Sequence, residues 1–115
     1  MQATIYHNPY CSKSRAVLEW LTKQDVEVEV VSYLEQPLTE QELQDLLAKL
    51  AVSPREVMRT DVPAYQEQGL SDEKLSDKEL IAAIATAPAL LNRPIVVTEK
   101  GAKLCRPIEL VETLL

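Results

Sequence analysis

The chain has 115 residues, of which 46% are apolar and 26% are charged, and these values suit one globular domain. Its net charge of −6 argues against general nucleic-acid binding, because that function needs a basic surface. No apolar run approaches the ~20 residues of a membrane span, and the first residues lack the basic and apolar regions of a signal peptide. We therefore expect one cytoplasmic domain with no membrane or nucleic-acid partner.

The first third of the chain predicts a strand, a helix and a second strand. Residues 3–6 are expected to form a short strand, which Pro9 ends. A helix is predicted from about Ser12 to Lys23, with apolar residues on one face. Residues 26–30 alternate apolar and acidic side chains with the period of a strand.

Three capping boxes predict helix starts in the middle of the chain. In each, a Ser or Thr is followed three residues later by Glu, so that two backbone N–H groups are satisfied. The boxes are Thr39 with Glu42, Ser53 with Glu56, and Ser76 with Glu79. The first starts a helix with an apolar stripe through Leu50, the second a short helix through about Met58, and the third a helix through about Ala85. Another short helix is expected over 62–68, ended by Gly69.

The last part of the chain predicts a β-hairpin followed by a helix. Residues 95–97 form a compact apolar strand, 98–101 a turn and 102–105 the returning strand. A final helix begins at Pro107. The order is a βαβ unit, a helical middle and a ββα unit, which indicates an α/β fold with one small mixed sheet flanked by helices.

Cys11 lies in the loop between the first predicted strand and helix. The free N–H groups and the positive dipole end of that helix, together with Lys13 and Arg15, favour the nucleophilic thiolate. The same N–H groups suit an oxyanion. His7 could add positive charge or a hydrogen bond. The alternative is a buried packing cysteine, but the position and the flanking charges favour a reactive one.

Ser14 stands where a dithiol redox motif would carry its second cysteine. A covalent intermediate on Cys11 must then be resolved by an external thiol, although Ser14 also suits the first turn of a helix. Cys105 is interpreted as a small packing residue, with a resolving thiol as the alternative left open. One histidine and two separated cysteines make no metal-ligand pattern.

Three arginines are candidates for an anion site in this acidic chain. Arg93 precedes the third predicted strand and Arg106 follows the fourth, so a hairpin would place both at the same end of the sheet. Arg59 follows a short helix. Guanidinium groups suit tetrahedral oxyanions. For any one arginine, pairing with a surface carboxylate is the simpler explanation, and the sequence does not show that the three converge.

Four blocks of sequence carry a resemblance that covers essentially the whole chain. They are Tyr6-His7-Asn8-Pro9-x-Cys11-x-x-Ser14-Arg15, Met58-Arg59, Leu91-Asn92-Arg93-Pro94-Ile95-Val96-Val97 and Leu104-Cys105-Arg106-Pro107. In these blocks the chain resembles the glutaredoxin-dependent arsenate reductases of the ArsC family. The run from Cys11 to Arg15 is most similar to the YfgD-like branch. Arsenate reductases proper usually carry a glycine directly after the cysteine, where this chain has Ser12.

The resemblance implies a thioredoxin-like (glutaredoxin-like) fold for a single domain over residues 1–115, with a helical insertion at about 52–87. It also implies the roles of seven residues. The catalytic group is Cys11, His7 and Ser14, the oxyanion-binding group is Arg59, Arg93 and Arg106, and Pro94 is a cis proline beside the site.

The activity implied by the resemblance is reduction of arsenate to arsenite in the cytoplasm. Glutathione is the expected co-substrate and glutaredoxin the expected partner, with no bound cofactor and no metal. One alternative is a glutathione-linked thiol oxidoreductase with another substrate. A second is an Spx-like regulator that binds RNA polymerase; Ser14 argues against the dithiol switch of such regulators, and the three arginines argue for an anion site.

Overall fold

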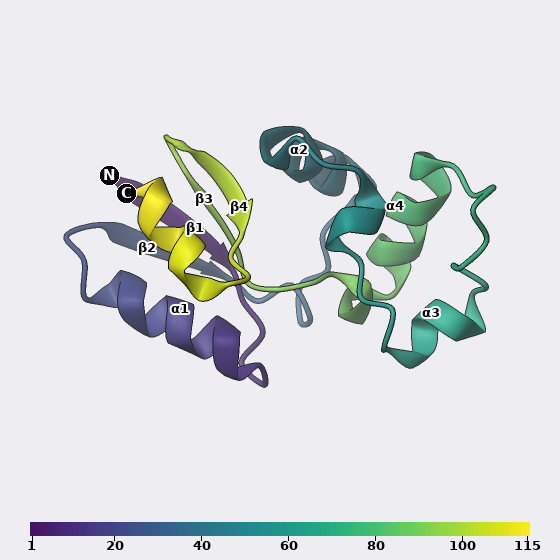
Figure 1. The fold of residues 1–115 in the computed structure, drawn as a ribbon, viewed down its shortest axis with the longest axis horizontal. Coiled ribbons are helices and arrows are strands. Elements are labelled where there is room, and N and C mark those ends of the chain that lie inside the picture. Colours follow the sequence, from purple (N-terminus) through teal and green to yellow (C-terminus); the bar gives the residue numbers. More distant parts are fainter. The chain divides into compact units, whose positions relative to one another are not determined.

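The computed structural model describes residues 1–115 as two compact units (Figure 1). The first unit combines Met1–Gln36 with Arg93–Leu115, and the second is Pro37–Asn92. The range expected for a helical insertion, 52–87, lies within the second unit. None of the helices is long and apolar enough to cross a membrane.

The first unit is built on a four-stranded mixed sheet, as the sequence predicts. Its strands are β1 (Gln2–Tyr6), β2 (Glu27–Val31), β3 (Ile95–Thr98) and β4 (Gly101–Leu104), in the order β2-β1-β3-β4. Strand β1 pairs parallel with β2 and antiparallel with β3, and β3 pairs antiparallel with β4. The two segments of the chain that form the first unit therefore meet at the β1–β3 pair.

Two helices cover one face of this sheet. The helix α1 (Ser12–Thr22) makes the crossover that the parallel β1–β2 pair requires. The last helix, η3 (Ile108–Leu114), is of the 3-10 type. Their buried residues share a core with β1, β3 and the residue after β4: Ala3, Ile5, Val17, Leu21, Val96, Cys105, Val111 and Leu114. This core holds α1 against the sheet, and it thereby also positions the loop that precedes α1.

The regular elements of the second unit are helices, with one isolated β-bridge between Met58 and Leu91. It contains α2 (Glu40–Leu50), η1 (Pro54–Val57), α3 (Pro63–Glu67), α4 (Asp77–Thr86) and η2 (Pro88–Leu90). These elements confirm the four predicted helices of this region, although the helix expected through Met58 is a short 3-10 turn. No pattern in the sequence predicts η2.

The predicted caps form at both long helices of the second unit. Thr39 Oγ1 accepts the Glu42 N–H at 3.1 Å, and Glu42 Oε1 accepts the Thr39 N–H at 3.0 Å. Ser76 and Glu79 make the same reciprocal pair. The α3 segment is followed by Gly69 at φ 63°, a left-handed conformation that glycine adopts without strain.

Candidate active site

Cys11 is the residue at which the chain leaves the β1 loop and enters α1. It has an extended backbone as the N-cap of that helix. Its N–H donates to the Asn8 carbonyl at 3.1 Å, and its own carbonyl accepts the Arg15 N–H at 3.0 Å. The loop therefore closes on itself just before the helix, and Cys11 is 7% exposed.

The surroundings of Cys11 favour its thiolate. Burial by itself raises the pKa of the thiol, but the N–H groups of Ser14 and Lys13 and the guanidinium of Arg93 outweigh burial, so the pKa lies below its ordinary value. Arg93 acts both through its charge and through a hydrogen bond to the sulfur. A lowered pKa raises the fraction of the nucleophilic thiolate at neutral pH. The predicted direction and the predicted role of the helix N–H groups agree with this, but the charge that lowers the pKa is that of Arg93 and not of Lys13 or Arg15.

Ser14 is the centre of a buried polar network in the first turn of α1. Its side chain is fully buried, and its Oγ lies 2.7 Å from His7 Nδ1. The same oxygen accepts the Asn8 N–H at 3.1 Å. Ser14 therefore ties the end of β1 and the loop to the helix that carries Cys11.

His7 is buried, and its pKa is lowered by this burial and by the positive charge of Arg15. A pKa below the ordinary 6.5 leaves the imidazole neutral at pH 7. His7 therefore adds no positive charge near Cys11, which was one of its two expected contributions. Its hydrogen bond goes to Ser14.

The loop that precedes Cys11 is held by side-chain contacts as well. Arg15 Nη1 donates to the Pro9 carbonyl at 2.7 Å, and Asn8 Oδ1 accepts the Tyr10 N–H at 2.9 Å. The second contact is an Asx turn, in which a side-chain oxygen replaces a backbone acceptor. Between these contacts the side chain of Tyr10 projects from the surface, 85% exposed.

Arg93 and Arg106 lie together at one end of the sheet, as the predicted hairpin requires. Strands β3 and β4 pair Ile95 with Leu104, and Arg106 Nη1 donates to the Arg93 carbonyl at 3.1 Å. The Arg93–Pro94 peptide bond is cis, as the resemblance implies. The Arg106–Pro107 bond is also cis, which the sequence analysis did not anticipate. Within the first unit, the structure thus brings Cys11, Arg93 and Arg106 to one place.

Arg59 belongs to the second unit. Its N–H donates to the Leu90 carbonyl at 2.7 Å, and its guanidinium pairs with Asp61 at 2.7 Å. The Arg59 side chain is 25% exposed and that of Asp61 67%. Arg59 therefore forms the kind of surface ion pair that was the simpler explanation for each arginine. The approach of Arg59 to Cys11 stays a prediction.

Cys105 is enclosed in the core of the first unit. It is fully buried, and burial raises the pKa of its thiol to about 11. Such a thiol is almost entirely protonated at neutral pH and is a poor nucleophile. Both cysteines are free. These facts favour the packing role of Cys105 over the resolving role.

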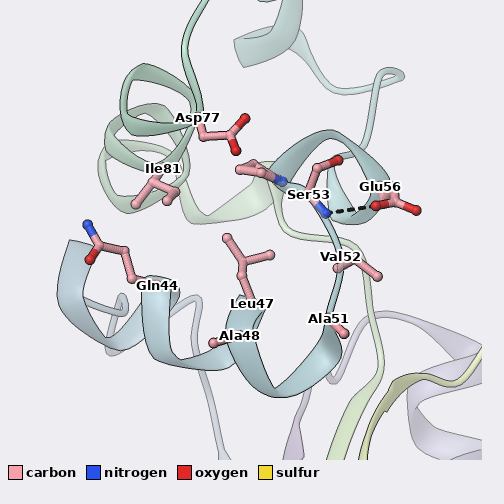
Figure 2. A pocket seen from close by; sticks show the side chains of 10 residues that line it. Gln44, Leu47, Ala48, Ala51, Val52, Ser53, Glu56, Asp77 and Ile81 are labelled. Atoms are coloured by element: carbon pink, nitrogen blue, oxygen red, sulfur yellow. Dashed lines mark hydrogen bonds between the residues drawn. The ribbon is translucent and has the colours of Figure 1, made fainter.

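Two other hollows of the molecule lack the groups of this site. A groove of about 490 Å³ in the second unit has Leu47 and Ile81 on its walls and Glu56 and Asp77 at its rim (Figure 2). No cationic or thiol side chain lines it. No group of three or more His, Cys, Asp or Glu side chains is placed to hold a metal ion.

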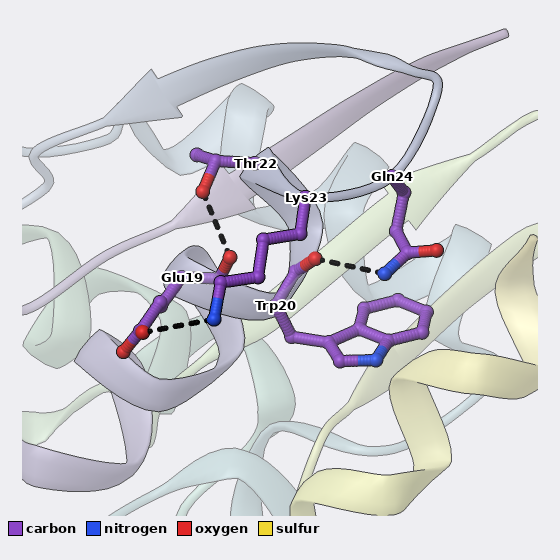
Figure 3. A network of polar contacts seen from close by, with 5 residues as sticks. All are labelled: Glu19, Trp20, Thr22, Lys23 and Gln24. Carbon is purple, nitrogen blue, oxygen red and sulfur yellow. Dashed lines mark hydrogen bonds and ion pairs between the residues drawn. The ribbon is translucent and has the colours of Figure 1, made fainter.

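A smaller cavity of about 190 Å³ lies in the first unit between α1 and η3, and Trp20 forms part of its wall. Figure 3 shows the adjoining end of α1, where Gln24 bonds to the Trp20 carbonyl at 3.1 Å and Lys23 pairs with Glu19 at 3.2 Å. This cavity is walled by apolar and acidic side chains, so it does not suit an oxyanion. The Cys11 loop is the place where a nucleophile and positive charge coincide.

Comparison with known proteins finds a family and several relatives that match nearly the whole chain. The ArsC family model matches residues 6–114. An arsenate reductase from Escherichia coli is 46% identical over 112 residues, which are 97% of this chain and 79% of the relative. The protein YfgD of Escherichia coli (strain K12) is 48% identical over 111 residues, 96% of this chain and 93% of that protein. A solved structure of an arsenate reductase from Vibrio cholerae has a TM-score of 0.95 at 42% identity, covering 100% of this chain and 98% of that one.

Proposed function

The chain belongs to the ArsC family, and from that premise we propose that it is an arsenate reductase whose nucleophile is the Cys11 thiolate. The observation that carries the proposal is the lowered pKa of the Cys11 thiol. N–H groups of α1 and the Arg93 guanidinium lower this pKa, and together they outweigh the effect of burial. The same groups that favour a thiolate favour an incoming oxyanion. Relatives named arsenate reductase, at about 45% identity, support the choice of substrate.

Substrate binding is assigned to the three arginines. Arg93 lies beside the sulfur, and Arg106 is bonded to the Arg93 carbonyl, so both can face an anion above Cys11. Arg59 completes the set in this proposal. To bind arsenate, its guanidinium must exchange part of its bond to Asp61 for a bond to the substrate.

The chemistry is covalent catalysis by an activated thiolate. The Cys11 thiolate attacks arsenic, an As–S bond forms, and hydroxide leaves with a proton as water. Glutathione then adds its sulfur to arsenic with loss of a second water. The two sulfurs couple to a disulfide, both As–S bonds break, and arsenic keeps two electrons. Water returns to arsenic, so arsenite is released and Cys11 is left as a mixed disulfide with glutathione.

His7 and Ser14 are assigned to positioning the nucleophile. The buried Ser14 hydroxyl, held between His7 and the Asn8 N–H, fixes the first turn of α1 whose N–H groups face the sulfur. Because His7 is neutral at pH 7, its contribution is this hydrogen bond and not a charge.

Glutathione as co-substrate and glutaredoxin as the protein reductant complete the proposed cycle, with no bound cofactor or metal. Glutaredoxin removes glutathione from Cys11, since the chain offers no second reactive thiol: Ser14 replaces one and Cys105 is buried. We place the reaction in the cytoplasm, where the glutathione pool is kept reduced.

A second function, a glutathione-linked oxidoreductase with another substrate, is favoured by two observations. Ser12 follows the nucleophile where arsenate reductases proper usually have glycine, and the chain is 48% identical to YfgD, whose name states no activity. It would use the same Cys11 chemistry and show no dependence on arsenate.

The test is arsenate-dependent oxidation of NADPH with glutathione, glutathione reductase and glutaredoxin. We expect activity in the wild type, loss to background in Cys11→Ser, and retention in Cys105→Ala, since only Cys11 is a poised thiolate. A folded wild type with a titratable Cys11 but no arsenate dependence would move the assignment to the second function. Capture of RNA polymerase by such an inactive protein would favour the regulator instead.

A further inference from the structure

Tyr10 is an exposed aromatic side chain directly before the nucleophile. It is 85% exposed, whereas the other two exposed large apolar residues, Met1 and Val30, are 45% and 44% exposed. We propose that Tyr10 is a contact residue for the protein thiol reductant that regenerates Cys11. This inference rests on the proposed function and deepens it by assigning a surface to the partner.

The backbone that carries Tyr10 is fixed on both sides. Its own N–H is bonded to Asn8 Oδ1, the Pro9 carbonyl before it accepts from Arg15, and the Cys11 N–H after it donates to the Asn8 carbonyl. The ring is thus presented from a closed turn and has only its two side-chain torsions to lose on binding. Large aromatic side chains of this kind carry much of the binding energy at protein interfaces at a small cost in entropy.

The location of Cys11 explains why a protein surface must cover Tyr10. Cys11 is 7% exposed, so glutathione joined to it lies close over the loop, and a thiolate that attacks the glutathione sulfur must approach that loop. Any protein that brings a thiol there meets the residue next to Cys11. Tyr10 does not line the cavity between α1 and η3, and its side chain is 85% exposed, which suits an interface and not a cleft for a tripeptide.

The step that this contact serves is a thiol–disulfide exchange. The reductant's thiolate attacks the glutathione sulfur of the Cys11 mixed disulfide, the disulfide bond breaks, and Cys11 departs as a thiolate. The reductant then holds glutathione in a new mixed disulfide. The N–H groups and Arg93 that stabilise the Cys11 thiolate also make it a good leaving group.

The test uses the Cys11–glutathione mixed disulfide, made on the full chain with oxidised glutathione. The rate of its cleavage is followed by mass spectrometry against glutaredoxin concentration for Tyr10→Ala, Tyr10→Phe and Val30→Ala. We expect the half-saturating glutaredoxin concentration to rise about three- to tenfold in Tyr10→Ala. Tyr10→Phe keeps the ring and should stay near the wild type. Val30→Ala is the matched control, an exposed apolar residue of the same unit outside the loop.

Two outcomes overturn the proposal. The first is a glutaredoxin dependence of Tyr10→Ala equal to that of Val30→Ala, which would show that Tyr10 makes no productive contact. Alternatively, cleavage by glutathione alone slows as much as cleavage by glutaredoxin, which would assign Tyr10 to the small thiol. The assay contains no arsenate, so an absence of arsenate turnover in the wild type would sink the proposed function without deciding the role of Tyr10.

Discussion

The pKa of the Cys11 thiol is lowered by neighbours of two kinds: backbone N–H groups of α1, and the side chain of Arg93. Any helix N-terminus supplies such backbone groups, whereas Arg93 lies just before β3, more than eighty positions away in the chain. The two contributions can therefore be separated by mutation.

Replacing Arg93 with Gln should raise the pKa of the Cys11 thiol, because a positive charge that stabilises the thiolate is lost. The rate of alkylation of Cys11 by iodoacetamide, measured against pH, should then rise at higher pH than in the wild type. Arg106→Gln is the matched control, since the Arg106 guanidinium is bonded to the Arg93 carbonyl and does not lower the pKa of Cys11. Equal shifts in both variants would contradict the specific role of Arg93.

His7 offers a second measurement, because it is the single histidine of the chain. Burial and then Arg15 lower its pKa, so its NMR titration midpoint should lie below 6.5, and Arg15→Gln should move the midpoint upward. The folded state resists protonation of His7 more than the unfolded state does. Its contribution to the free energy of unfolding is therefore present above pH 6.5 and declines as the pH falls below that value. A midpoint at or above 6.5 would contradict the buried, neutral imidazole.

The position of Cys11 at a loop–helix junction could be predicted from sequence, since a strand, a proline and a helix start are all local signals. The contact of His7 with Ser14 could not. It joins residues seven positions apart across an irregular turn, and no periodic pattern specifies where such a turn brings its ends. The ion pair of Arg59 with Asp61 was considered only as a general possibility for surface arginines.

At the scale of elements, the helices with caps and apolar stripes were the most predictable. The Thr39 and Ser76 boxes both form, and Leu43, Leu46 and Leu47 of the first stripe are buried. The end of α2 carried no such signal, because its left-handed C-cap is Ala51 and not glycine. The 3-10 form of η3 was also not predictable, since periodicity over seven residues does not distinguish two helix types.

Thr39→Ala should lower the free energy of unfolding by about 1 kcal/mol, because Thr39 Oγ1 satisfies the Glu42 N–H at the start of α2. Urea denaturation followed by far-UV circular dichroism measures this change. Thr60→Ala is a suitable control, an exposed threonine outside the helices whose loss should matter little. Equal destabilisation by both variants would show that the cap contributes nothing measurable.

At the scale of the whole molecule, the first unit is discontinuous in sequence. Strand β1 pairs with β3, so the sheet is complete only when Met1–Gln36 and Arg93–Leu115 have come together. Bringing together two segments so far apart in the chain costs loop-closure entropy. Local sequence signals do not show which distant segments pair. The sequence order of elements nevertheless predicted the mixed sheet, because βαβ and ββα units each have one favoured arrangement.

Leu21→Ala tests the core that joins these two segments. Leu21 is fully buried in the cluster shared by α1, β1 and η3, so its truncation should cost about 2–5 kcal/mol of unfolding free energy. The single tryptophan, Trp20, is packed against this cluster and reports its unfolding by fluorescence. Val30→Ala, at an exposed site of β2, should change the same transition by less than about 0.5 kcal/mol. A Leu21→Ala transition no different from that control would contradict the packing described.

The enclosure of Cys105 has a consequence for damage by peroxide. A thiol whose thiolate is favoured, as at Cys11, is oxidised first to a sulfenic acid, and in many redox proteins a neighbouring thiol captures that species as an internal disulfide. Here the position of a neighbour is taken by Ser14, and the other thiol is sealed in the core with a pKa of about 11. No second thiol of the chain is placed to form a disulfide before the irreversible sulfinic acid appears. Protection of an oxidised Cys11 therefore depends on how quickly an external thiol reacts with it.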